Sequence, residues 1–178
     1  MGYWGYFVVS RAERPLTERD GPASAADMTL RASAPDGWRV WEYPGGEGDV
    51  GNMNDLAART GAPALFGYVM DSACVVIEAA APESGAWTTC LVRTAMAGYL
   101  GAEREGLTLE DYFLEPRDAA ERAVAWAAEA GRTADAGELT EVLSAGLRDD
   151  AGGPSGDAAP TAEDLFFRFL DRLGVVPL

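Results

Sequence analysis

Three apolar segments follow one another closely in the middle of the chain, namely Ala64–Met70, Cys74–Ala81 and Ala86–Val92. Only Asp71-Ser72-Ala73 separates the first two, and Pro82 to Gly85 separates the second and third. Asp and Ser side chains bond to the local backbone, while Pro and Gly supply the dihedral angles of tight turns. A parallel connection would need a crossover of a dozen or more residues. The spacing therefore predicts an antiparallel sheet.

Three further strands are predicted upstream, which gives a sheet of five or six strands. Tyr3–Val9 is aromatic and β-branched with apolar residues on both faces, as in a central strand. Met28–Ser33 and Trp38–Tyr43 flank Ala34-Pro35-Asp36-Gly37, which is a strong turn signal. The N-terminal half is therefore predicted to form the sheet.

Helical patterns dominate the C-terminal half. Helices are predicted over residues 94–100, 116–130, 136–147 and 162–173, with one short helix upstream at 50–60. Pro116 and Thr161 suit helix starts, and Gly131 and Gly174 suit helix ends. The last helix has a stripe of large apolar side chains that must pack on the body of the protein or on a second copy. A homodimer formed through this helix is therefore one of the two alternatives.

The predicted fold class is α+β, with a mostly antiparallel sheet covered by helices mainly from the C-terminal half. A length of 178 residues suits one domain, predicted over 1–178. Its strand-rich part spans 1–92, its helical part spans 93–178, and a flexible connector occupies 149–160.

Composition excludes several chemistries. The chain has no histidine, and all 14 basic residues are arginine, which removes the usual catalytic triad, imidazole metal ligation and lysine Schiff bases. A net charge of −15 opposes binding to nucleic acid and favours a basic partner, although it also serves to keep a protein in solution. No apolar run is long enough to span a bilayer and no signal-peptide pattern opens the chain, so a cytoplasmic location is expected.

Two short motifs have both a chemical and a structural interpretation. Gly46-Glu47-Gly48-Asp49-Val50-Gly51 matches the dinucleotide-binding pattern, but its two acids would face a pyrophosphate, so no cofactor is predicted. Asp71-Ser72-Ala73-Cys74 contains two nucleophilic groups, but no histidine or lysine is present to activate them. A turn followed by a buried cysteine is the better prediction.

The two cysteines are expected to be reduced and buried. Two are too few for a disulfide scaffold. A hairpin in which Ala81 faces Ala86 would set Cys90 opposite Ile77, three residues from Cys74, which is out of register for a disulfide.

Four acids lie close together in a predicted loop, namely Glu103, Glu105, Glu110 and Asp111. Carboxylate oxygens can hold a hard cation, but this spacing matches no EF-hand and acidic loops are usually solvated, so no metal site is predicted. The four acids are instead candidates for a partner surface, or for paired carboxylates in a pocket.

Aromatic side chains gather on two predicted strands. The candidates for a partner or pocket surface are Trp4, Tyr6, Trp38, Trp41 and Tyr43. Core packing explains some of them, but strands with aromatics on both faces also suggest a groove or an interface.

The segments MGYWGYFVVSRAERPL and TGAPALFGYVMDSACVVIEAA resemble a group of small, acidic, uncharacterised proteins from high-GC bacteria. This resemblance implies no activity and no catalytic residues. By analogy with small acidic α+β proteins that act as immunity partners of secreted toxins, the first expectation is a non-enzymatic interaction module that binds a basic protein. The alternative is a small-molecule-binding protein or a hydrolase that uses paired carboxylates.

Overall fold

The computed structural model describes residues 3–11, 29–34, 37–44, 53–100, 113–145 and 161–175. The strands are β1 (Gly5–Ser10), β2 (Thr29–Ser33), β3 (Arg39–Pro44), β4 (Ala64–Met70), β5 (Cys74–Ala81) and β6 (Gly85–Leu91). The helices are α1 (Met53–Thr60), α2 (Arg93–Leu100), α4 (Pro116–Glu129), α5 (Ala136–Ser144) and α6 (Ala162–Leu173). None of these helices is long and apolar enough to cross a membrane.

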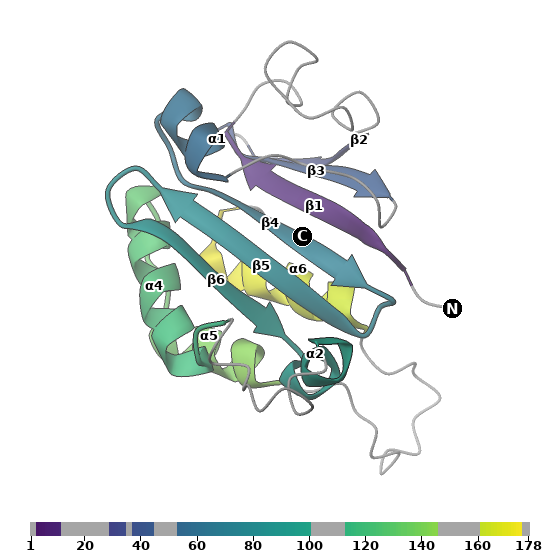
Figure 1. Ribbon diagram of the computed structural model, residues 1–178. Coiled ribbons are helices and arrows are strands. Elements are labelled where there is room, and N and C mark those ends of the chain that lie inside the picture. The colour runs from purple at the N-terminus through teal and green to yellow at the C-terminus, as the bar shows by residue number, and fades with distance from the viewer. Residues whose placement is uncertain are drawn as a thin grey trace.

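The six strands form one sheet in the order β2-β3-β1-β4-β5-β6 (Figure 1). Every neighbouring pair is antiparallel. The α+β class with an antiparallel sheet from the N-terminal half is therefore confirmed. The prediction that the first strand is central is also confirmed, because β1 lies between β3 and β4.

The connection between β4 and β5 is a tight turn, as predicted. The Ala73 N–H donates to the Met70 carbonyl at 2.9 Å. Asp71 and Ser72 have φ angles of 53° and 52°, in the left-handed region that Asp tolerates better than most residues. Asp71 and Ser72 are therefore the two residues whose left-handed conformation reverses the chain here.

The predicted register between β5 and β6 is wrong by one residue. Gly85 pairs with Ala81, so Cys90 lies opposite Val76 and not opposite Ile77. Gly85 has a φ of +83° and serves both as the turn residue and as the first residue of β6, which therefore begins one position earlier than expected. Both cysteines consequently point to the same face of the sheet.

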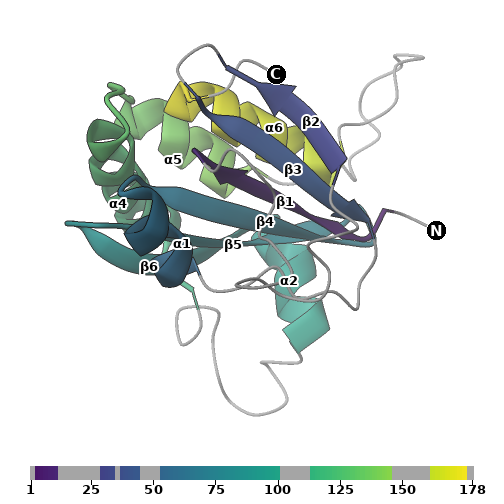
Figure 2. The same ribbon diagram turned by 90° about the horizontal axis from the view of Figure 1, so that it is seen from above.

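Helices α4, α5 and α6 cover one face of the sheet, as Figure 2 shows. The apolar stripe of α6 is fully buried within the chain and consists of Leu165, Phe166, Phe169, Leu170 and Leu173. A capping box between Thr161 and Asp164 starts α6, and Gly174 in the left-handed conformation ends it, both as predicted. Because its apolar face is already covered, α6 packs on its own sheet.

Of the helices that the structure describes, the short helices α1 and α2 lie on the opposite face (Figure 2). Met53, Leu56 and Ala57 of α1 pack against Val8 and Phe66 of the sheet. Helix α2 contacts β5 and β6.

Candidate functional site

The sheet surface beside α1 is lined with aromatic side chains. We call this the aromatic face and define it as Trp4, Tyr6, Trp41, Tyr43, Phe66 and Tyr68. Strand alternation places them together, since side chains two residues apart share a face. One row across the sheet joins Tyr43, Tyr6 and Tyr68, because Tyr6 pairs with both tyrosines. A second row joins Trp41, Val8 and Phe66.

The rings of the aromatic face contact one another. Tyr6 stacks on Tyr68 with ring centroids 4.4 Å apart and an interplanar angle of 18°. It meets the edge of Phe66 at 5.7 Å and is tilted against Tyr43 at 6.3 Å. Trp4 extends the cluster through Tyr68 at 6.2 Å. Tyr6 is therefore at the centre of five contacting rings, those of Trp4, Tyr6, Tyr43, Phe66 and Tyr68.

This surface is only partly covered. Tyr6, Trp41, Tyr43 and Tyr68 are half-buried, and the Trp4 side chain is 39% exposed. Leu30, which pairs with Trp41 from the outer strand β2, is 45% exposed. These are the two large hydrophobic residues exposed in the described part of the chain. Burial among the rings also raises the pKa of Tyr68, which keeps its hydroxyl protonated.

The segment that carries Trp4 is held in place by Ser72. The Tyr3 N–H donates to the Ser72 hydroxyl oxygen at 2.7 Å, and the Ser72 N–H donates to the Tyr3 carbonyl at 2.9 Å. The Ser72 hydroxyl donates to Glu163 at 2.9 Å, and the Ala162 N–H donates to the Ser72 carbonyl at 3.0 Å. Ser72 thus joins the N-terminal segment, the β4–β5 turn and the start of α6.

The side chain of Tyr3 points to the other face, where it reinforces the same segment. Its hydroxyl donates to Glu42 at 2.6 Å, and Glu42 also pairs with Arg31 at 3.2 Å. Burial and the hydrogen bond to Glu42 raise the pKa of Tyr3 well above its ordinary range. Tyr3 therefore acts as a neutral hydrogen-bond donor.

Four of the five aromatic residues predicted from the sequence lie together on the aromatic face, namely Trp4, Tyr6, Trp41 and Tyr43. Trp38 does not, because it is fully buried on the helix-covered face with its ring 5.6 Å from that of Trp126. The prediction that Trp38 belongs to a partner or pocket surface is therefore wrong. Trp38 and Trp41 are three residues apart on an extended chain, and that odd spacing puts them on opposite faces.

Sequence reasoning missed Phe66 and Tyr68. Both were assigned to the interior of a strand, although their spacing of two residues is the signal that they share one face. The four acids proposed for a surface or a pocket, Glu103, Glu105, Glu110 and Asp111, lie outside the described residues, as does the glycine motif at 46–51. The strand before that motif, β3, is antiparallel to both neighbours, whereas a dinucleotide-binding loop follows a parallel strand.

The thiols are buried, as predicted, and lack the environment of a nucleophile. Neither cysteine forms a disulfide. Burial, together with the neighbouring Cys90 and Asp71, raises the pKa of the Cys74 thiol to about 12. An arginine does approach a thiol, since Arg93 lies 3.8 Å from the sulfur of Cys90, but that thiol is also completely buried. Buried thiols of this kind are inert.

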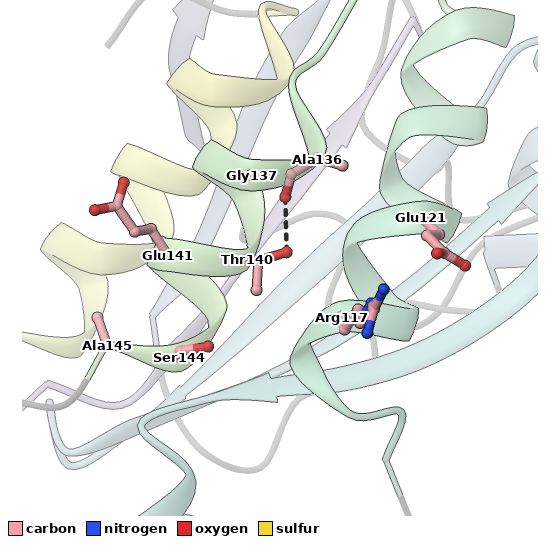
Figure 3. Close-up of a pocket in the computed structure, with 8 residues that line it drawn as sticks. All are labelled: Arg117, Glu121, Ala136, Gly137, Thr140, Glu141, Ser144 and Ala145. Carbon is pink, nitrogen blue, oxygen red and sulfur yellow. Dashed lines mark hydrogen bonds between the residues drawn. The ribbon is translucent and has the colours of Figure 1, made fainter.

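A groove of about 660 Å³ runs between α4 and α5 (Figure 3). Its described lining is Arg117, Glu121, Ala136, Gly137, Thr140, Glu141, Ser144 and Ala145. The side chains of Glu121 and Glu141 point away from each other. The Thr140 hydroxyl donates to the Ala136 carbonyl at 2.7 Å. This groove therefore does not supply the converging carboxylates that a hydrolase would need.

Comparison with family models, with curated proteins and with solved structures gives no match.

Proposed function

We propose that this protein is a non-enzymatic interaction module whose aromatic face binds a basic protein partner. The observation that carries the proposal is the position of Trp4 and Leu30. Both side chains are exposed, Trp4 contacts the half-buried Tyr68, and Leu30 lies opposite the half-buried Trp41. Single exposed apolar residues are common, whereas a contiguous exposed apolar patch is typical of an interaction surface. Tyr and Trp are enriched in the centres of such surfaces.

Charge supports a basic partner over a second copy of the chain. The net charge is −15, so two copies repel each other while a cationic protein is attracted. The faces of aromatic rings also attract cations. An immunity-like role, in which the basic partner is a secreted toxin, is one form of this proposal.

The test compares three immobilised proteins in a native lysate at low salt. They are the wild type, the double variant Trp4→Ser/Leu30→Ser, and the control Arg117→Ser on the helix-covered side. We expect the wild type and the control to retain a basic protein that salt releases and that the double variant retains poorly. The retained protein is then purified, and its affinity for each of the three proteins is measured directly.

Equal affinity for the wild type and the double variant would overturn the proposal. So would a dimer of the wild type that the double variant abolishes, because the occupant of the face would then be a second copy. Both substituted residues are exposed, so the double variant is expected to remain folded.

A further inference from the structure

A single carboxylate lies at the end of one row of the aromatic face. Phe66 pairs with Glu78 on β5, and Glu78 pairs in turn with Thr88 on β6. Directly opposed side chains have Cβ atoms about 4.5–5.5 Å apart. The side chains of Glu78 and Phe66 are therefore neighbours on the same side of the sheet.

Glu78 makes no hydrogen bond or ion pair with any residue that the structure describes. Its side chain reaches solvent, yet the packed protein around it removes enough water to raise the pKa of the carboxyl group. Glu78 therefore presents an exposed carboxylate that no residue in the described part of the chain bonds.

There is room beside this carboxylate. A cavity of about 70 Å³ is lined by Glu78 and Thr88 of the sheet and by Met53 and Asn54 of α1, among others. The cavity places a carboxylate and an amide side chain around one small space at the border of the aromatic face. Such a space suits a cationic hydrogen-bond donor.

We propose that Glu78 binds the guanidinium group of an arginine on the partner, while the aromatic face packs against the rest of that side chain and its neighbours. This inference rests on the function proposed above. Arginine fits better than lysine, because its planar guanidinium stacks on aromatic rings and bonds a carboxylate through two parallel N–H groups. An unpaired carboxylate next to aromatic rings, in a chain of net charge −15, selects such a group.

The probe is an amidated octapeptide of alternating glycine and arginine, compared with its lysine counterpart. Affinity is measured by isothermal titration calorimetry at low salt and by quenching of tryptophan fluorescence. We expect Glu78→Gln to weaken binding of the arginine peptide about three- to tenfold. The matched control is Glu141→Gln on α5, which changes the net charge equally and should leave the affinity within about twofold of the wild type.

The outcomes separate this inference from the proposed function. If Trp4→Ser/Leu30→Ser abolishes peptide binding while Glu78→Gln behaves like Glu141→Gln, the aromatic face is a binding surface and the role of Glu78 is refuted. If none of these variants changes the affinity, both proposals fail. Equal or tighter binding of the lysine peptide would refute the assignment to arginine. A loss of binding by Glu78→Gln supports the role of Glu78 when the melting temperature of the variant is at least that of the wild type.

Discussion

Glu78 and Glu129 carry the same carboxyl group in opposite surroundings. The pKa of Glu78 is raised by burial, and no described group bonds to it. Burial also acts to raise the pKa of Glu129, but three hydrogen bonds outweigh it and lower that pKa. They come from the N–H groups of Glu83 and Ser84, both at 2.8 Å, and from the Ser84 hydroxyl. Ionised Glu129 therefore stabilises the β5–β6 turn.

We expect Glu129→Gln to lower the free energy of unfolding at pH 7 by about 1 kcal/mol, because a neutral amide replaces a charged acceptor. The folded-state pKa is lowered, so this contribution is present above the ordinary value of 4.5 and is lost as the pH falls through the folded pKa. Urea unfolding at a series of pH values measures it. Glu121→Gln, on the exposed side of the same helix, is the control, and an equal loss of stability at pH 7 in the two variants would contradict the prediction.

The opposite sign is expected for Glu78→Gln. The folded-state pKa of Glu78 is raised, so the folded protein binds this proton more tightly, and that stability is lost as the pH rises through the folded pKa. The variant should therefore be more stable than the wild type at pH 7, and the difference should shrink under acidic conditions. A variant less stable at pH 7 would show that Glu78 is paired in the free protein.

Ser72 provides the third test at the level of single residues. Ser72→Ala removes the hydroxyl between Tyr3 and Glu163, and we expect it to cost about 1–3 kcal/mol of unfolding free energy. A double-mutant cycle with Glu163→Gln should show coupling between the two sites. Strict additivity would mean that the hydrogen bond between Ser72 and Glu163 contributes nothing.

At the scale of the elements, α6 packs closely on the sheet because the residue of β4 beneath it is a glycine, Gly67. A Cβ atom on Gly67 of β4 would lie 2.5 Å from the Phe166 ring, which is closer than real Cβ contacts allow. Gly67 thus lets the helix sit close to the strand, at the cost of a weaker strand residue.

We expect Gly67→Ala to destabilise the fold by about 1–3 kcal/mol, since α6 must shift or Phe166 must leave its rotamer. Phe166→Leu reduces the clash, so the double variant should be more stable than the sum of the two single effects. Thermal unfolding of the four proteins measures this coupling. Additive effects would show that the helix does not depend on this contact.

The elements themselves could be predicted far better than their arrangement. Strands and helix ends follow from local signals, such as the turn at 71–73 or the capping box at Thr161, which depend on residues close in sequence. The strand order depends on contacts between distant residues, as when Val8 pairs with both Trp41 and Phe66. The predicted register of β6 was wrong because Gly85 is both a turn residue and the first residue of the strand. The turn signal alone does not show that a turn residue also pairs in the sheet.

At the scale of the whole molecule, charge is the dominant feature. With 29 acidic and 14 basic residues, like charges repel across the folded chain. We expect the melting temperature to rise by several degrees when sodium chloride increases from about 0.01 M to about 1 M, because the screening length falls from about 30 Å to about 3 Å. Sodium chloride is preferred to sulfate salts, which strengthen apolar burial on their own. A falling melting temperature would mean that attractive pairs outweigh the repulsion.

The sheet order also has a consequence during synthesis. β1 leaves the ribosome first, yet it lies between β3 and β4, so its second neighbour is missing until residue 70 has emerged. During that interval an aromatic strand has an unpaired edge, which is a template for association with other chains. β4, β5 and β6, in contrast, are contiguous and can pair as they emerge. Slow translation of the segment between β1 and β4 therefore prolongs the period in which a nascent chain is most prone to aggregate.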